Sequence, residues 1–196
     1  MKVRQAFILI TLLLSLCGCA GSSRSFDETT VIVGKNGKIT NAIIEDFDKQ
    51  YYQKNGLLDM VNEEISEYVK LTGNKDAVKL SRFEVENGKA YVYIDFQDYS
   101  DYAAFNKVDF FYGSVSAAYE KGYDMNVILK SAVGTETIGK DEIITMGKNN
   151  ILIVSDKVAV RTGMPILYTS ANVEVLDEKQ ARISSESEGL AYLILK

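Results

Sequence analysis

The sequence predicts an α+β fold, in which an antiparallel sheet built from hairpins packs with one main amphipathic helix and a β-rich C-terminal region follows. Asn36-Gly37 and Asn87-Gly88 each separate two β-prone segments, which is a strong short-range signal for a β-hairpin. Residues 57–72, between the two hairpins, carry apolar side chains at the spacing of one helical face. The 196 residues are 46% hydrophobic and 25% charged, so the chain can bury a core as one domain.

The first half of the chain is expected to run as hairpin, helix and hairpin. Residues 29–33 and 38–44 pair around the first turn signal, and Gly73-Asn74 ends the helix. Residues 78–86 and 89–96 form the second hairpin. Its returning strand alternates, so one face carries Ala90, Val92, Ile94 and Phe96, and the other carries Tyr91, Tyr93 and Asp95.

Two short helices and further extended segments are expected after the second hairpin. Ser100 is the expected N-cap of a helix that reaches about residue 105, with Asp101 in its first turn. Residues 114–121 form the second short helix, which Gly122 stops. Residues 108–112 and 127–133 have the composition of strands.

An internal repeat marks the C-terminal region. The pattern I-L-x-x-S-x-x-V-x-V occupies residues 151–160 and recurs fifteen positions later in residues 166–175. Two copies are too few for a solenoid, so the repeat predicts two successive hairpins in one antiparallel sheet. Residues 181–184 and 190–195 add further strands, and Pro165 lies between the copies, where no ladder hydrogen bond is needed.

Missing residue types limit the chemistry. The chain has no histidine and no tryptophan, and its two cysteines, Cys17 and Cys19, both lie in the first twenty residues. Histidine triads, cysteine nucleophiles and structural zinc sites are therefore excluded from the rest of the chain, and we expect neither a metal nor a cofactor. The net charge is -5 and no lysine or arginine run is present, which argues against nucleic acid as a partner.

The N-terminus carries an export signal. Lys2 and Arg4 precede an apolar stretch over residues 6–16, which is too short to span a hydrocarbon core of about 30 Å. Leu16-Cys17-Gly18-Cys19 resembles the lipobox of bacterial lipoproteins. The resemblance implies cleavage after Gly18 and a diacylglyceryl group on Cys19, so that acyl chains hold the protein to the extracytoplasmic side of a cell membrane.

Alternatives to this lipid anchor are an ordinary signal peptide or an uncleaved membrane anchor. Cys17 fits the lipobox less well than Cys19, because Leu16 would stand where the peptidase needs a small side chain. With the lipobox, the predicted organisation is a signal peptide over residues 1–18, a lipidated cysteine and flexible tether over 19–28, an α+β domain over 29–133 and a β-rich subdomain over 134–196. The mature part is similar in kind to small uncharacterised surface lipoproteins.

Three patterns have a chemical interpretation beside a structural one. Residues 134–141 contain G-x-x-x-x-G-K, but Asp141 replaces the Ser/Thr that would hold magnesium in a P-loop, so a surface loop is expected. Asp95, Asp98 and Asp101 could offer oxygens to calcium, although helix capping and solvation explain them more simply. A pair of carboxylates could hydrolyse glycans, but the sequence selects no catalytic pair among 27 acids.

Aromatic side chains give the best candidate for a binding surface. Eleven of the 20 Tyr and Phe residues lie within residues 91–123. We expect Tyr91, Tyr93, Tyr99 and Tyr102 to form a recognition surface for an envelope protein or glycan, unless a second layer covers them. The predicted function is therefore a binding module at the cell envelope, with a carboxylate-dependent hydrolase acting on cell-wall or other glycans, or a purely structural role in assembly, as the alternatives.

Overall fold

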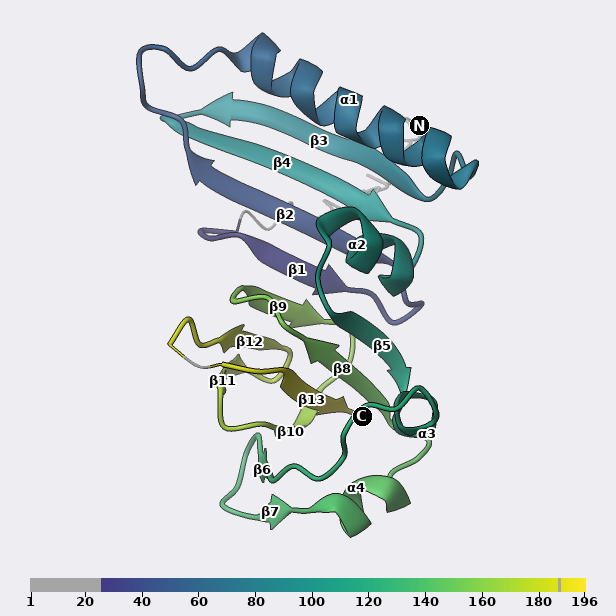
Figure 1. Cartoon of the computed structure of the whole chain (residues 1–196). Helices are drawn as coiled ribbons and strands as arrows, with labels where there is room; N and C mark the ends of the chain where they lie inside the picture. Colours follow the sequence, from purple (N-terminus) through teal and green to yellow (C-terminus); the bar gives the residue numbers. More distant parts are fainter. Residues whose placement is uncertain (1–25, 187) are drawn as a thin grey trace, which may run out of the picture.

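The protein has an α+β fold made of two sheets and one long helix, as the sequence predicts (Figure 1). The computed structural model describes residues 26–186 and 188–196; the predicted signal peptide, the lipobox and Cys19 lie outside these residues. The seven-stranded sheet has the order β11-β12-β9-β1-β2-β4-β3, and the six-stranded sheet has the order β5-β8-β13-β10-β6-β7. All neighbouring strands are antiparallel except β1 and β9.

The strands of the seven-stranded sheet, in sheet order, are β11 (Val173–Asp177), β12 (Gln180–Ile183), β9 (Ala159–Thr162), β1 (Thr30–Val33), β2 (Ile39–Asp46), β4 (Lys89–Phe96) and β3 (Val78–Glu86). Those of the six-stranded sheet are β5 (Phe110–Ser114), β8 (Asn150–Val154), β13 (Ala191–Leu195), β10 (Ile166–Thr169), β6 (Leu129–Ser131) and β7 (Thr137–Ile138). Both sheets combine strands from before and after residue 134, since β1 pairs with β9 and β5 pairs with β8.

Both predicted hairpins are confirmed. β1 pairs with β2, and β3 pairs with β4, each around its predicted turn. Asn87 and Gly88 both have positive φ angles, 52° and 74°, which is the geometry that a tight two-residue turn requires. These turns fix the register, so that Ala90, Val92, Ile94 and Phe96 are buried on one face of β4.

The main helix is also confirmed. α1 spans Lys54–Thr72 and ends at Gly73, whose φ of 67° lets its N–H donate to the Val69 carbonyl at 2.9 Å. The helix starts three residues before the predicted start at Leu57 and packs along β3 through Leu57, Ile65 and Val69.

The described part of the chain also contains three short helices: α2 (Tyr99–Asn106), α3 (Val115–Glu120) and α4 (Lys140–Thr145). Ser114 caps α3, at the start of the predicted segment. The predicted cap of α2 is wrong, because its N-cap is Asp98 and not Ser100. The Asp98 carboxylate accepts from the backbone N–H groups of Ser100 at 2.8 Å and Asp101 at 3.2 Å, so the helix begins earlier than the serine would place it.

The two copies of the repeat are not hairpins, which corrects the prediction. In each copy the first strand, β8 or β10, lies in the six-stranded sheet, and the second, β9 or β11, lies in the seven-stranded sheet. The serine between them therefore marks a passage from one sheet to the other. An apolar strand pattern reports extended backbone, but long-range burial decides which strand is the partner.

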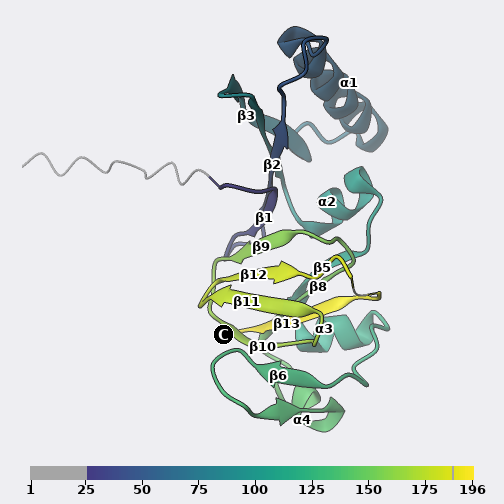
Figure 2. The same cartoon turned by 90° about the vertical axis from the view of Figure 1, so that its left-hand side faces the viewer.

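The core lies between the layers. α1, α2 and the six-stranded sheet all pack on one face of the seven-stranded sheet, around buried residues that include Val31, Ile94 and Leu193 (Figure 2). A second core, around Phe111 and Ile153, lies between the six-stranded sheet and α3 and α4. Among the residues that the structure describes, no helix packs on the other face of the seven-stranded sheet.

Candidate functional site

The face of the seven-stranded sheet that points away from α1 and α2 is the candidate site, and we call it the open face. No helix or further strand within residues 26–186 and 188–196 lies over it (Figure 2). The following residues point to it from six adjoining strands: Arg82, Tyr91, Tyr93, Ala42, Thr30, Ala159 and Arg182. Antiparallel sheets commonly keep one face solvated, and here that face carries large aromatic and charged side chains.

Cross-strand register gives the open face its shape. Tyr93 lies opposite Ala42, which lies opposite Thr30, which in turn lies opposite Ala159. These three small residues are at most 1% exposed. Small side chains therefore line the middle of the open face, and larger ones flank it: Tyr93 and Arg82 on one side and Arg182 on the other.

Arg82 lies over both tyrosine rings of the open face. Its guanidinium carbon is 5.2 Å from the centre of the Tyr93 ring and 5.8 Å from that of Tyr91, within the range of a cation–π contact. Glu84 forms an ion pair with Arg82, whose hydrogen bond holds the pKa of Glu84 below its usual value. The Tyr93 hydroxyl is buried and has no hydrogen-bond partner among the described residues.

A groove of about 510 Å³ continues the open face at the end of the sheet where β2 ends and β4 begins. Its lining carries both signs of charge together with apolar side chains such as Ile44 and Ile183. The lining residues are Asp27, Glu28, Thr29, Ile44, Glu45, Asp46, Lys89, Lys157, Val158, Ala159, Arg182, Ile183 and Ser185. Ile44 lies directly opposite Tyr91 across the β2–β4 pair, so the groove and the tyrosines form one surface.

Ion pairs fix the charged walls of the groove. Arg182 bonds Glu28 at 2.6 Å and Glu174 at 3.2 Å, and Lys89 bonds Asp46 at 3.0 Å. Lys157 forms no ion pair with any residue that the structure describes, so its ammonium group is available to an anionic partner. A groove with paired and unpaired charges suits a polar ligand that carries both donors and acceptors.

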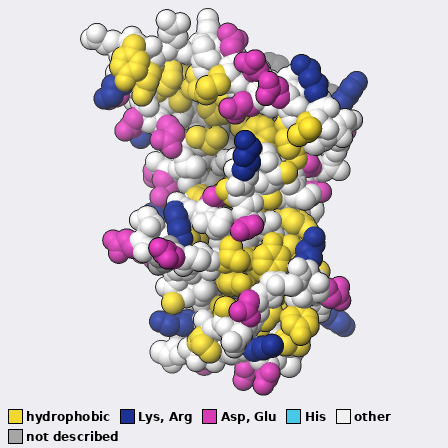
Figure 3. Space-filling view, viewed as in Figure 1, with side chains coloured by type: hydrophobic (Ala, Val, Ile, Leu, Met, Phe, Trp, Pro, Cys, Tyr) yellow, Lys and Arg dark blue, Asp and Glu magenta, His cyan; other side chains and the backbone are white. Residues whose placement is uncertain are grey.

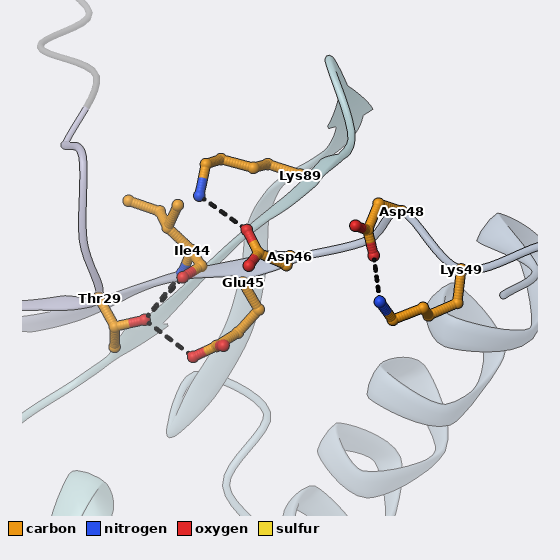
Figure 4. A network of polar contacts seen from close by, with 7 residues as sticks. All are labelled: Thr29, Ile44, Glu45, Asp46, Asp48, Lys49 and Lys89. Carbon is orange, nitrogen blue, oxygen red and sulfur yellow. Dashed lines mark hydrogen bonds and ion pairs between the residues drawn. The ribbon is translucent and has the colours of Figure 1, made fainter.

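Thr29 ties the start of β1 to the groove (Figure 4). Its hydroxyl accepts from the Ile44 N–H at 2.9 Å and lies within 3.4 Å of a Glu45 carboxylate oxygen. Asp46 and Lys89 lie beside it, and Asp48 and Lys49 form a further pair at 3.4 Å as the chain leaves β2. These hydrogen bonds therefore hold the segment that leads into β1 against the end of β2.

The structure brings together only two of the four predicted site tyrosines. Tyr91 and Tyr93 are half-buried and share the open face. Tyr102 is 2% exposed on α2, and its hydroxyl donates to Asp156 at 3.0 Å, so it belongs to the core. Tyr99 packs edge-on against Phe111 with ring centres 5.0 Å apart, on the other side of the seven-stranded sheet.

The three aspartates that suggested calcium each have a separate structural partner. Asp95 accepts from the Thr40 hydroxyl at 2.6 Å, Asp98 caps α2, and Asp101 accepts from the Tyr68 hydroxyl at 3.1 Å. Within the described part of the chain, no group of three or more Asp, Glu, Cys or His side chains could hold a metal ion.

The P-loop-like segment forms a strand and a helix start without a phosphate cradle. Residues Thr137 and Ile138 are β7, and Gly139 is the N-cap of α4. The Glu142 carboxylate accepts from the Gly139 N–H at 3.1 Å. An acidic side chain thus occupies the position where a P-loop would place phosphate.

The sequence analysis did not predict the two arginines of the site, Arg82 and Arg182. Arg82 could have been found, because it alternates outward on β3 as Tyr91 and Tyr93 do on β4. Arg182 and Glu28 are 154 positions apart, and no local pattern brings them together.

Comparison with known protein families, with curated proteins and with solved structures finds no match for this chain. Of the helices in the described residues, none combines the length and the apolar character needed to cross a membrane.

Proposed function

We propose that this protein is a lipid-anchored binding module on the extracytoplasmic side of the cell envelope, and that its open face holds an envelope protein or glycan. Cys19 carries the diacylglyceryl anchor, and the folded part recognises the partner through Tyr91, Tyr93, Arg82 and the adjoining groove. The observation that carries the proposal is that two tyrosines and an arginine stand on a sheet face that no described element covers.

The chemistry of these side chains supports recognition. Tyrosine offers a broad apolar ring together with a polar hydroxyl, and tyrosine and arginine are the residue types enriched at binding hot spots. The Tyr93 hydroxyl is itself buried with Arg82 beside its ring, so the guanidinium and the accessible parts of the two half-buried rings are what the surface offers a partner.

The groove carboxylates support binding better than hydrolysis. Of its four acids, Glu28 and Asp46 are held in ion pairs with Arg182 and Lys89. An ion pair favours the charged carboxylate, whereas a glycosidase needs one carboxyl group that carries a proton to the leaving group. The purified chain should therefore leave cell-wall glycans uncleaved, and a Glu45→Gln, Asp46→Asn variant should give the same result; cleavage by the original chain that this variant loses would favour the hydrolase.

The distribution of thiols supports the anchor. After cleavage behind Gly18, Cys19 would be the one cysteine of the chain, at the position that the lipobox acylates. Two acyl chains are sufficient for stable attachment, where a single chain would be marginal. A Cys19→Ala variant should leave the membrane fraction and lose the lipid mass; retention of both would contradict the anchor.

Partner capture tests the open face. The lipid-free mature chain, residues 20–196, is immobilised and exposed to envelope extract and to purified cell-wall glycans. Tyr91→Ala with Tyr93→Ala should abolish capture while the domain keeps its cooperative melt. Tyr119→Ala is the matched control, because Tyr119 is 51% exposed on α3, far from the open face. If the double variant no longer melts cooperatively, the two rings belong to the core and the proposal fails.

A further inference from the structure

An apolar corner lies at the end of the seven-stranded sheet, where β2 leads into α1. Phe47, Tyr51, Tyr52 and Met60 form it, and we call it the aromatic corner. Tyr51 is 75% exposed, Met60 51% and Tyr52 40%. In Figure 3 hydrophobic side chains gather at the upper left, where Figure 1 draws this connection and the start of α1.

The aromatic corner is held in place by the fold. Tyr52 packs against Phe47 and Tyr51, each with ring centres 4.9 Å apart. The Phe47 N–H donates to the Gly88 carbonyl at 2.6 Å, which ties the corner to the β3–β4 turn. A groove of about 500 Å³ runs beneath these rings and is floored by Ile43, Ala90 and Val92. These exposed rings thus form a defined apolar surface next to an apolar groove.

The chain enters the fold at this same end of the sheet. β1 begins at Thr30, opposite Ala42, and Thr29 bonds the backbone of Ile44, three residues before Phe47 (Figure 4). Phe26, the first described residue, follows Cys19 by seven positions. Seven residues extend to at most about 25 Å, so an anchor on Cys19 keeps this end of the sheet near the lipid.

We infer that the aromatic corner docks onto the surface of the bilayer that holds the lipid anchor, which fixes the orientation of the folded part on the membrane. The inference rests on the proposed attachment through Cys19. Tyrosine is enriched at membrane–water interfaces because its ring is apolar and its hydroxyl is wet. Exposed Tyr51, Tyr52 and Met60 supply that kind of surface where the short tether brings lipid within reach.

The charges near the corner do not favour an anionic lipid, so we assign the docking to a zwitterionic surface. Lys49 and Lys54 are matched by Asp48 and Asp59, and Glu45 and Asp46 line the groove beneath the rings. The corner therefore has no net positive charge to attract anionic headgroups. Lys49 is already paired with Asp48 at 3.4 Å. Docking therefore depends on the apolar rings and on the high local concentration that the tether provides.

A single tryptophan reports on the docking, because the chain has none of its own. Tyr51→Trp is prepared as the mature chain, and Cys19, its one thiol, is coupled to a maleimide phospholipid in phosphatidylcholine vesicles. Tyr119→Trp is the matched control, since Tyr119 is 51% exposed on α3 at the far end of the molecule. With brominated acyl chains in the vesicles, quenching at position 51 should exceed that at position 119 by about threefold, with a blue-shifted emission.

Equal quenching at the two positions would overturn the docking. Replacement of Tyr52 and Met60 by Ser in the Tyr51→Trp chain should reduce its quenching to the control level. If instead the chain forms dimers in sedimentation that the Tyr52→Ser, Met60→Ser change abolishes, and position 51 is not quenched, the corner is an interface between copies. Since the coupling is chemical, the quenching result is independent of acylation in cells, which the Cys19→Ala fractionation tests separately.

Discussion

The guanidinium carbon of Arg82 lies 5.2 Å from the centre of the Tyr93 ring, on the face of the seven-stranded sheet opposite α1. The contact joins neighbouring strands β3 and β4, and the Tyr93 hydroxyl is buried in it. Arginine and tyrosine are among the residue types that dominate binding hot spots. The proposed function depends on this pair and on the groove beside it.

The first prediction compares two tyrosine hydroxyls: that of Tyr93, which has no hydrogen-bond partner among the described residues, and that of Tyr102, which donates to Asp156. Tyr93→Phe should leave the free energy of unfolding unchanged or raise it by up to about 1 kcal/mol, because no hydrogen bond is lost. Tyr102→Phe should lower it by about 1–3 kcal/mol, since the bond from that hydroxyl to charged Asp156 is removed in a buried site. Urea titration of both variants checks this, and a larger loss for Tyr93→Phe would contradict it.

The second prediction concerns the cap of α2. Asp98→Ala should lower the free energy of unfolding by about 1 kcal/mol, and Asp98→Asn by less, because the amide keeps an acceptor for the first turn. Thermal melts of the two variants in parallel measure the difference. If Ser100→Ala cost more than Asp98→Ala, the cap would be assigned to the wrong residue.

Asp98 also makes stability depend on pH. Burial alone would raise the pKa of Asp98, but the hydrogen bonds from Ser100 and Asp101 outweigh it and hold the pKa below its ordinary 3.8. The folded state thus favours the charged carboxylate, so this stabilisation is present above pH 3.8 and is lost as the pH falls through the lower folded value. Asp98→Asn should flatten that part of the curve of stability against pH, and an unchanged curve would contradict the assignment.

The repeat serines give another prediction. Ser155 Oγ accepts from the Asp109 N–H at 3.1 Å, and Ser170 Oγ accepts from the Tyr192 N–H at 2.9 Å, so both copies use their serine in the same way. The Ser170 hydroxyl also donates to the Asn172 side chain at 2.6 Å, and its hydrogen bonds are part-buried, whereas the one that Ser155 accepts is exposed. Ser170→Ala should lower the free energy of unfolding by about 1–2 kcal/mol and Ser155→Ala by less. Equal losses on urea titration would argue against this ranking.

Local signals in the sequence predicted the local structure well. Asn36-Gly37 and Asn87-Gly88 placed both hairpins, and the apolar spacing followed by Gly73 placed α1, because turns and helix ends depend on neighbouring residues. The repeat was interpreted as two hairpins because the same apolar pattern suits a strand with any partner. Which sheet takes β8 or β9 depends on burial among residues far apart in the chain.

The candidate site was predictable only in part, for the same reason. Alternation on β4 placed Tyr91 and Tyr93 on one face, and the structure has them there. Tyr99 and Tyr102 follow on a helix that packs on the other face, and their proximity in sequence gave no sign of it. Arg182 reaches the groove from β12 through its bond to Glu28, which only the folded chain brings near.

A further prediction is that substitution of Arg182 weakens binding but not folding stability. Its ion pairs with Glu28 and Glu174 are partly exposed, and exposed pairs contribute little to folding. Arg182→Ala should therefore leave the thermal midpoint nearly unchanged while it weakens partner capture. Lys179→Ala, a change at a half-buried lysine of the β11–β12 turn, is the control. A variant that melts early, or one that captures the partner as well as the original chain, would remove Arg182 from the proposed site.

Photo-crosslinking in cells tests the open face most directly. A photoreactive phenylalanine analogue replaces Tyr91 in the full-length chain, and a second chain carries it at Tyr119. We expect a discrete adduct with an envelope component from position 91, lost when Arg82→Ala is added, and none from position 119. If position 91 gives no adduct, or the two positions give the same adducts, the open face is not the binding site.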